Sequence, residues 1–555
     1  MGRIRGLRWD WLGPLSLTVL ALVLRLWNLG RPNRLIFDET YYAKDAYSLR
    51  RFGYVRDFTE GANAKIADGR LDGLFTNDPS WIVHPDGGKW LIAGGEWLFG
   101  MNSFGWRFSA ALVGSLTVLL LARLVLRLTG STWIACLAGL LLCLDGMHLV
   151  MSRTALLDVF LTFWLVAAVA CLVADRDWID ARLDGPRRLF RPWQLAAGLC
   201  FGMAVGTKWS AVWVLAVLGV ATVGWELVRR RDLRAGLWVA PLAFVTIVGT
   251  AFVVYLATWS GFLLHADLYE QRFGLGYGDY PPWGAYVEDP TGGPFGGVVD
   301  AFRSLWHFHV MTYDFHTGSY LAGKTHPYAS DPAGWLVLDR PVAFDAQNDL
   351  PAASCGAPAD SSCMREITAL GNPAVWWTGS VAVLVAVVAW VRTVLRDHVT
   401  QRDARWAGPL VVAPLVLAVP ATIAVLVLPQ GARTPVAAAM AIVLAATLCL
   451  ERRWSIALLG VASTWLPWFL YDDRPIFSFY AVTTLPFLVL ATCLVVDALR
   501  RRAATPRQRA GVAAGVGVLV GATVALFVYF HPILTDALVP YQDWYARMWF
   551  GRRWI

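Results

Sequence analysis

Long apolar stretches separated by short polar segments restrict the fold of this chain more than any other feature. Several are about twenty residues long, the length that a helix needs to cross a bilayer. Hydrophobic residues make up 57% of the chain and charged residues 16%, which is too apolar for a soluble protein. The stretches lie near residues 15–30, 107–126, 132–149, 155–173, 194–206, 209–227, 237–257, 374–394, 408–428, 434–450, 455–470, 476–498 and 510–530. The sequence therefore predicts an all-α polytopic membrane protein with about 11 to 13 transmembrane helices.

Arginine clusters recur on alternate connections and predict the orientation of the chain. Short loops rich in Lys and Arg stay on the cytoplasmic side of a membrane. The arginines gather before the first apolar stretch, near 182–191, 229–234 and 392–405, and around 500–509. We therefore expect a multi-pass plasma-membrane protein with a cytoplasmic amino terminus and an extracytoplasmic carboxyl terminus. Residues 1–530 form its transmembrane domain, with two large extracytoplasmic loops at 31–105 and 259–372, and residues 531–555 form an extracytoplasmic tail.

The net charge of +8 indicates contact with lipid and requires no nucleic acid. Cytoplasmic arginines beside anionic lipid headgroups account for most of it. The first apolar stretch lacks a small-x-small cleavage site before Arg31-Pro32, so we interpret it as a retained anchor and not as a secretory signal.

Two of the eight cysteines stand apart from the others. Cys355 and Cys363 lie close together in the second large loop, in CGAPADSSC. An oxidising exterior permits a disulfide there, worth about 2–3 kcal/mol by loop closure; two free thiols are the alternative. The other six lie in apolar stretches, where we expect them to be packing residues.

The acidic pair Asp38-Glu39 directly follows the first apolar stretch, in RLIFDETYYAKDAY. Ionised groups beside hydrocarbon are costly and are usually functional. Phe37 and Tyr42 would partly desolvate the two carboxylates, and a helix is expected to begin near Thr40. A carboxylate in such a setting can act as a general base toward a hydroxyl. A solvated turn after the anchor is the simpler alternative.

Other polar segments fall on the same predicted face of the membrane. They read HPDGGK from His84 to Lys89, LDGMHLVMSRTALLD from Leu144 to Asp158, GTKWSA around Lys208, and LPWFLYDDRPIFSFY around Arg474. Taken one at a time, these segments need no functional explanation, because an ordinary loop histidine or a structural salt bridge would account for each. Together they would line one outer cavity, with an interfacial helix expected near 88–99. Such a cavity suits a substrate with a phosphate head and a lipid tail. The sequence has no His/Cys cluster at zinc spacing, no Walker loop and no GxSxG elbow.

Several segments, taken in order, resemble those of protein O-mannosyltransferases, a family with the GT-C fold that uses polyprenyl- or dolichyl-phosphate-mannose. They are FDETYYAKDA, HPDGGKW, GWRFSAAL, LDGMHLVMSRTALLD, GTKWSA, HPYASDPAGWLVLDRP, LGNPAVWW and RPIFSFYAVTTLPF. The resemblance covers about residues 25 to 500. It implies that the chain transfers mannose from polyprenyl-phosphate-mannose to Ser/Thr hydroxyls of an unfolded polypeptide at the outer membrane face, with inversion at the anomeric carbon.

The resemblance also implies roles for individual residues. Asp38 matches the catalytic acid and would act as the base, with Glu39 positioning the acceptor. The basic residues expected at the donor phosphate and sugar are Lys89, Arg107, Lys208 and Arg474. Further matched positions, for which no role is implied, are His84, Asp145, Arg153, Asp158, His326 and Tyr328. No cofactor is implied, and a requirement for a divalent metal stays open.

The chain also departs from the family pattern. Residues 259–372 are too few to hold the β-trefoil-like MIR insertion of eukaryotic members, which indicates a bacterial enzyme, and the arginine-rich composition suits an actinobacterial genome. HPDGGK lacks the prolines that commonly follow His-Pro, so the local backbone is expected to differ. The alternatives are a related GT-C enzyme that delivers another sugar or uses another acceptor, and a transporter or channel. An unfolded acceptor is compatible with contact to the secretion channel, although no residue indicates it.

Overall fold

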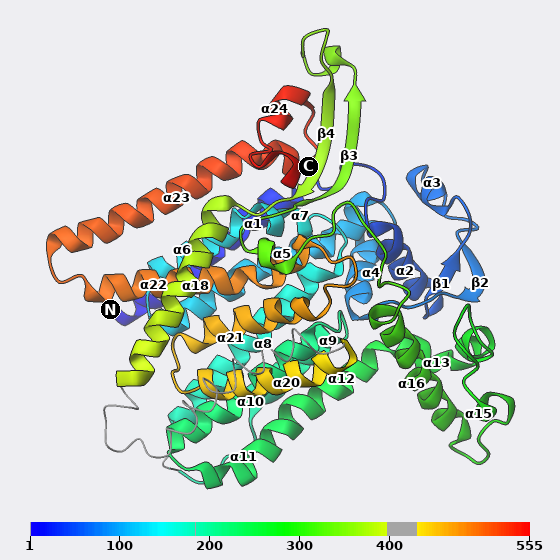
Figure 1. Ribbon diagram of the computed structural model, residues 1–555, viewed down its shortest axis with the longest axis horizontal. Coiled ribbons are helices and arrows are strands. Elements are labelled where there is room, and N and C mark those ends of the chain that lie inside the picture. Colours follow the sequence, from blue (N-terminus) through cyan, green and yellow to red (C-terminus); the bar gives the residue numbers. More distant parts are fainter. Residues whose placement is uncertain (1, 184, 397–429) are drawn as a thin grey trace.

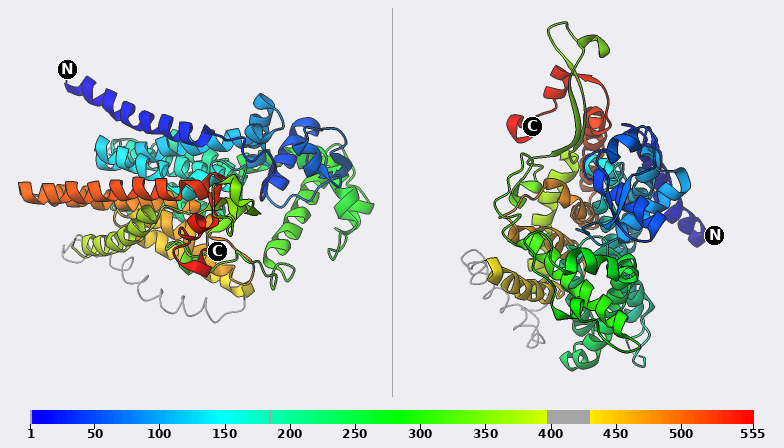
Figure 2. Two further views of the ribbon diagram at one scale, coloured as in Figure 1. Left: turned by 90° about the horizontal axis from the view of Figure 1, so that it is seen from above. Right: turned by 90° about the vertical axis from the view of Figure 1, so that its right-hand side faces the viewer.

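The computed structural model describes residues 2–183, 185–396 and 430–555, and its body is a bundle of long helices (Figures 1 and 2). Seven helical stretches in this part are long and apolar enough to cross a membrane. Helices satisfy their own backbone hydrogen bonds, as a lipid environment requires. The seven are in α1 (Gly2–Leu26), α5 (Ser103–Thr129), α8 (Leu157–Asp180), α10 (Ala211–Arg230), the run Leu233–Thr258 with α11 (Gly236–Ala243) and α12 (Thr250–Thr258), α18 (Pro373–Val394) and α23 (Pro506–Leu534).

Shorter helices complete the bundle and differ in places from the predicted spans. They are α6 (Thr132–Cys143), α9 (Pro192–Val205), α20 (Gln430–Leu448), α21 (Ser455–Trp465) and α22 (Leu485–Arg502). The span predicted at 132–149 stops early, because Asp145 accepts a 2.9 Å hydrogen bond from the His148 amide and starts the separate helix α7 (Gly146–Met151). The span predicted at 476–498 begins with a 3-10 turn, Ser478–Thr483. The span predicted at 408–428 lies outside the described residues.

Elements that do not span the bundle gather at one of its ends, on the right in Figure 1. They include α2 (Glu39–Phe52), α4 (Gly87–Phe99), α16 (Gly296–Thr317), and a two-stranded sheet of β1 (Arg56–Phe58) and β2 (Phe75–Pro79). The helices expected near Thr40 and at 88–99 correspond to α2 and α4. The remaining short helices are α3 (Ala62–Ala67), α13 (Ser260–Leu264), α14 (Ala266–Tyr269), α15 (Ala285–Glu288), α17 (Pro332–Trp335) and α24 (Tyr541–Tyr545).

A second, antiparallel sheet projects from the helical body as a hairpin (Figure 1). Its order is β3 (Val342–Leu350), β4 (Cys363–Ala369), β5 (Val539–Pro540), so the carboxyl-terminal segment pairs with the hairpin. Cys355 and Cys363 form a disulfide at the β3–β4 connection.

Arg25, in the first predicted span, points into the protein. Its side chain is fully buried; Nη1 donates to the Ala21 carbonyl at 3.1 Å, and Nη2 lies 2.8 Å from Nδ1 of His148. Arg153 donates to the carbonyls of Arg25 and Trp27, at 2.9 and 2.6 Å. The end of α1 is thereby fixed to the bundle, and the Arg25 charge is kept away from lipid.

Candidate functional site

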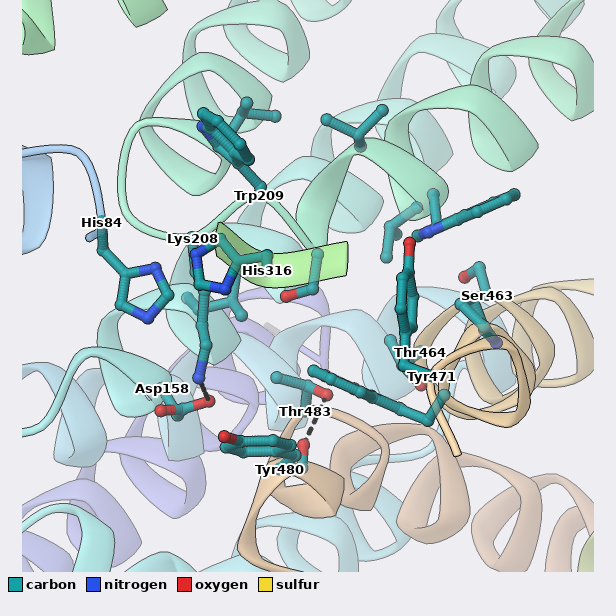
Figure 3. Close-up of a pocket in the computed structure, with 18 of the residues that line it drawn as sticks. His84, Asp158, Lys208, Trp209, His316, Ser463, Thr464, Tyr471, Tyr480 and Thr483 are labelled. Carbon is teal, nitrogen blue, oxygen red and sulfur yellow. Dashed lines mark hydrogen bonds and ion pairs between the residues drawn. The ribbon is translucent and has the colours of Figure 1, made fainter. Parts of the chain in front are cut away.

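A cavity of about 450 Å³ opens among segments that are far apart in the sequence. Residues of α8, α10, α12, α16 and α21 line it together with three connecting segments, and Figure 3 shows part of this lining. Four residues singled out from the sequence are in its wall: His84, Asp158, Lys208 and Arg474. Their convergence agrees with the expectation of one shared cavity.

Lys208 and Asp158 form an ion pair at the lower left of Figure 3, with Nζ 2.8 Å from Oδ1. The ammonium also lies 4.2 Å from the ring centroid of Tyr480. Burial alone would lower the pKa of Lys208, but the charge and hydrogen bond of Asp158, together with the nearby Tyr480 and Asp38, outweigh it and the pKa is raised. Lys208 therefore stays cationic, and an ammonium group has three N–H donors to share between Asp158 and a ligand.

Arg474 adds a second positive charge, held by a neutral histidine. Its Nη1 lies 3.3 Å from Nδ1 of His316, whose Nε2 is 3.3 Å from the Val83 carbonyl. One tautomer satisfies both contacts: Nε2 donates to Val83, and Nδ1 accepts from Arg474. Burial, with the charge of Arg474, lowers the pKa of His316 to about 4. The His316 ring stacks on His84, with 5.6 Å between centroids.

No carboxylate neutralises Arg474 within the described part of the chain. Its guanidinium contacts His316 and the face of Tyr471, and its buried Nε has no hydrogen-bond partner there. A buried donor without a partner is costly, and guanidinium groups match the oxygens of phosphate. This part of the cavity therefore suits a phosphate group.

Asp38 lies where α2 begins, beside the cavity but not in its lining. Aspartate often caps a helix, yet this side chain makes no capping hydrogen bond. Burial raises its pKa to about 6; the Lys208 charge opposes the rise and the Asp158 charge adds to it. The carboxylate is close enough to the cavity for both charges to act on it. In the described structure it has no hydrogen bond or ion pair of its own.

The backbone before Asp38 is held in an unusual conformation. Phe37 has a φ of +46°, in the left-handed region that non-glycine residues seldom adopt. Its ring stacks on Phe344 of β3 at 4.5 Å and meets the edge of Phe479 at 5.6 Å. Backbone strain of this kind persists only where the surroundings enforce it, often at functional sites. Here the two rings pack against Phe37, the residue immediately before Asp38, which is the N-cap residue of α2.

Glu39 points away from the cavity and binds Arg107. The pair is bidentate, with Nε–Oε1 at 2.7 Å and Nη2–Oε2 at 2.8 Å, and both side chains are at most 1% exposed. Glu39 also accepts from the amides of Ile36 and Ala155, at 3.1 and 3.0 Å.

The other N–H groups of Arg107 donate to backbone carbonyls. They belong to Leu29, Pro32 and Arg34, at 3.0 to 3.2 Å. Every guanidinium nitrogen therefore has a partner. We assign Arg107 and Glu39 to holding the segment 29–39 in place, instead of the phosphate and acceptor contacts expected from the sequence.

Lys89 is likewise enclosed by protein groups. Its ammonium is 1% exposed and lies 3.1 Å from both Asp45 and Asp86. Two carboxylates already compensate its charge, and it does not line the cavity. We therefore assign Lys89 a structural role in joining α2 to α4, in place of the expected phosphate contact.

The two glycines of HPDGGK allow α4 to start against the segment that carries Lys208. The Gly87 amide donates to the Gly206 carbonyl at 2.9 Å. A Cβ on Gly87 would lie 2.7 Å from that oxygen, and one on Gly88 would lie 2.8 Å from Leu157. Glycine permits this close approach. HPDGGK thus places His84 beside the cavity and Lys89 behind it.

Four other residues predicted from the sequence do not line the cavity: Asp145, Arg153, His326 and Tyr328. Asp145 accepts from the Asn372 amide and the Trp376 indole, both at 2.8 Å, besides capping α7. Arg153 holds the end of α1, as described above. His326 is exposed, and its Nδ1 accepts from the Tyr328 amide at 3.1 Å. These contacts are structural, and we assign no chemistry to the four residues.

Sequence reasoning missed His316, Trp209 and Tyr480 as individual residues of the site. Trp209 donates to the Tyr255 hydroxyl at 2.9 Å, and that hydroxyl lies 2.5 Å from Nε2 of His309. The signal for His316 was present in the histidine-rich stretch HFHVMTYDFHTGSY. Nothing in its spacing separates it from the other histidines there. Within the described residues, no group of three or more His, Cys, Asp or Glu side chains is arranged to hold a metal ion.

Comparison with known proteins gives consistent matches along the chain. Residues 15–270 match the family model of dolichyl-phosphate-mannose-protein mannosyltransferases, and residues 301–554 match the model of the carboxyl-terminal four-helix region of protein O-mannosyltransferases. A polyprenol-phosphate-mannose–protein mannosyltransferase of Mycolicibacterium smegmatis is 31% identical over 97% of this chain and 92% of its own length. The protein of that name from Corynebacterium glutamicum is 26% identical, with 96% and 92% covered.

Solved structures share the fold at lower identity. The protein O-mannosyltransferase Pmt1–Pmt2 complex of S. cerevisiae, bound to its sugar donor, superposes with a TM-score of 0.67 at 15% identity, covering 98% of this chain and 92% of the matched chain. An oligosaccharyltransferase of Archaeoglobus fulgidus gives a TM-score of 0.50 at 11% identity, with 97% and 57% covered.

Proposed function

Because the chain belongs to the family of dolichyl-phosphate-mannose-protein mannosyltransferases, glycosyltransferases of the GT-C fold, we propose that it transfers mannose from polyprenyl-phosphate-mannose to Ser and Thr hydroxyls of proteins. The names of its relatives supply the donor and the protein acceptor. The choice of Ser and Thr hydroxyls follows the resemblance of the sequence motifs to this family, and the proposed residue roles rest on the geometry of the site.

The donor phosphate is assigned to the cavity wall that carries Arg474 and Lys208. Arg474 lacks a carboxylate partner in the described structure, and Lys208 has N–H donors beyond its bond to Asp158. Both side chains line the cavity. Their charges stabilise the negative charge that develops on the phosphate as the carbon–oxygen bond to the sugar breaks.

Asp38 is assigned as the general base. In the proposed step the acceptor hydroxyl oxygen forms a bond to the anomeric carbon, its proton passes to the Asp38 carboxylate, and polyprenyl phosphate leaves with the electron pair of the broken bond. A single displacement of this kind inverts the anomeric centre. A pKa of about 6 leaves Asp38 largely ionised at neutral pH and able to accept that proton. The observation that carries the proposal is this unpaired carboxylate beside a cationic cavity.

The reaction is placed at the outer face of the plasma membrane. Asp38, His84 and Arg474 all fall in segments that the arginine pattern assigns outside. In this orientation the amino terminus is cytoplasmic, residues 1–530 form the catalytic membrane domain, and residues 531–555 follow on the outside.

The direct test is transfer of radiolabel in a purified system. Polyprenyl-phosphate-[³H]mannose and a Ser/Thr-rich peptide are incubated with the enzyme or with Asp38→Asn. The wild-type chain should label the peptide, and the variant should be slower by about a hundred- to ten-thousand-fold, the usual contribution of a general base. Near-normal labelling by a folded Asp38→Asn variant would rule out the base assignment. No labelling by the wild-type chain would argue against the donor, the acceptor or both.

A further inference from the structure

Strand β3 forms an edge of the projecting sheet. The strand order β3-β4-β5 leaves β3 with a partner on one side only. In Figure 1, α24 lies on the β4 side of the hairpin, away from the free side of β3. An edge strand presents a row of backbone N–H and C=O groups that can pair with another extended chain.

Within the described chain, the backbone of β3 hydrogen-bonds to β4 and to no other segment, although side chains of Arg34 and Phe37 contact it. Ala346, Asn348 and Asp349 of this strand are exposed. Natural proteins usually protect such edges by covering or shortening them. Strand β3 has bulges between Ala343 and Asp345 and between Gln347 and Leu350, which shorten its regular part. The nine-residue strand is nevertheless neither covered nor paired on its free side in the described chain and is therefore a candidate binding surface.

Residues of β3 contact the segment that immediately precedes the candidate base, Asp38. Phe344 of β3 stacks on Phe37, the residue before Asp38, at 4.5 Å. One position further along β3, Asp345 binds Arg34 at 2.6 Å, which ties the same catalytic segment to the strand. A chain running along β3 therefore reaches the segment that holds Asp38, and the edge is continuous with the proposed site.

We propose that the acceptor polypeptide docks as an added strand on the free edge of β3, which brings its hydroxyl-bearing residue to Asp38. This inference rests on the proposed function. Strand addition takes its affinity from main-chain hydrogen bonds, so it suits an unfolded acceptor whose side chains vary. A folded acceptor has no extended backbone to offer and is excluded.

The pairing is tested with the intact enzyme and a set of modified acceptors. In each acceptor peptide, one backbone amide is replaced by an ester, which removes one N–H donor. In an added strand only every second residue directs its N–H toward the neighbour. Apparent acceptor KM should therefore rise about two- to tenfold at alternate positions, with little change between them and with kcat unchanged.

The unmodified peptide separates this inference from the proposed function. If that peptide accepts mannose but the ester series shows no two-residue period, strand addition is overturned and the transferase assignment stands. If that peptide accepts no mannose, the proposed function fails first.

A crosslinking experiment locates the bound peptide independently. The photoreactive residue p-benzoylphenylalanine is placed at Asn348 on β3 or, as a matched control, at Tyr541, which is exposed on the opposite side of the sheet. The acceptor peptide should crosslink at position 348 and not at 541. Equal crosslinking at both positions, or crosslinking at 541 alone, would contradict docking on β3.

Discussion

The individual charges near the cavity divide into those that the protein already neutralises and those that it leaves for a ligand. Lys89 faces two carboxylates and Arg107 faces Glu39, whereas Arg474, among the residues that the structure describes, faces only a neutral histidine and an aromatic ring. Each of the three side chains carries a positive charge. The partner decides whether the charge can bind phosphate, because a compensated ion gains little from a second anion.

The pH dependence of transfer should report on Asp38. A base must be ionised, so kcat/KM is expected to fall as the pH drops through about 6, the raised pKa of Asp38. His316 titrates near 4 and the pKa of His84 is also strongly lowered, so neither histidine of the cavity explains a limb at this pH.

The identity of that limb can be checked by changing the charge beside it. Lys208 lowers the pKa of Asp38, so Lys208→Gln should move the acid limb of kcat/KM to higher pH, in addition to slowing transfer. Lys324→Gln, which removes an exposed ammonium elsewhere in the large loop, is the control and should leave the limb in place. An unmoved limb in Lys208→Gln would show that another group controls it.

Arg474 should matter for the donor and not for the acceptor. Arg474→Gln removes a charge-assisted hydrogen bond to phosphate, worth about 1.5–3 kcal/mol, so donor KM should rise on the order of 10- to 100-fold. Acceptor KM, measured at saturating donor, serves as the internal control. A larger effect on acceptor KM than on donor KM would refute the phosphate contact.

At the scale of elements, buried ion pairs connect pieces of chain that hydrophobic packing alone would not align. The Glu39–Arg107 pair fixes the start of α2 against α5, and Lys89 with its two aspartates joins α4 to α2. Breaking a buried pair leaves one charge uncompensated. Loss of either cluster should therefore be seen first in stability.

Glu39→Gln tests the contribution of the buried Glu39–Arg107 ion pair to stability. Removing one partner of a buried pair costs about 3–5 kcal/mol, so the variant should unfold at a clearly lower temperature and transfer slowly, because Asp38 is no longer positioned. Asp68→Asn is the matched control: it breaks the exposed Arg70–Asp68 pair, which contributes at most about 1 kcal/mol. A Glu39→Gln variant with unchanged melting temperature and low activity would instead place Glu39 in the chemistry.

The two ends of the helix bundle differ. Helices α2 and α4 and the hairpin lie toward one end, and the amino terminus lies at the other (Figures 1 and 2). Helices α1 and α23 bury little of their surface, 17% and 11% over their most apolar windows, which is expected where a helix faces lipid.

Labelling of intact cells can test the proposed orientation. A membrane-impermeant maleimide should react with Lys324→Cys in intact cells and with Arg188→Cys only after permeabilisation, because the arginine pattern places these two exposed positions on opposite sides. The unsubstituted chain, in which Cys355 and Cys363 are joined, controls for reaction at the native thiols. The reverse pattern would place the cavity on the cytoplasmic side and overturn the proposed location.

Much of this protein is determined locally and could be predicted from the sequence. Hydropathy is a property of a short window, so it located most of the helices, and the ordered motifs indicated the family. It failed at 132–149, where the side chain of Asp145 ends one helix and begins another. Family membership also decides against a transporter or channel.

Only the tertiary structure shows which basic residues already have a carboxylate partner. Glu39 and Arg107 are 68 positions apart, and Lys208 and Asp158 are 50 apart. No spacing rule connects such partners, because ion pairing in a buried site depends on distance in space and on what else excludes water. The sequence alone therefore predicted that these acids and bases lie on one face of the membrane. The fold determined which of them already form ion pairs within the protein and which have no partner of opposite charge in the described structure.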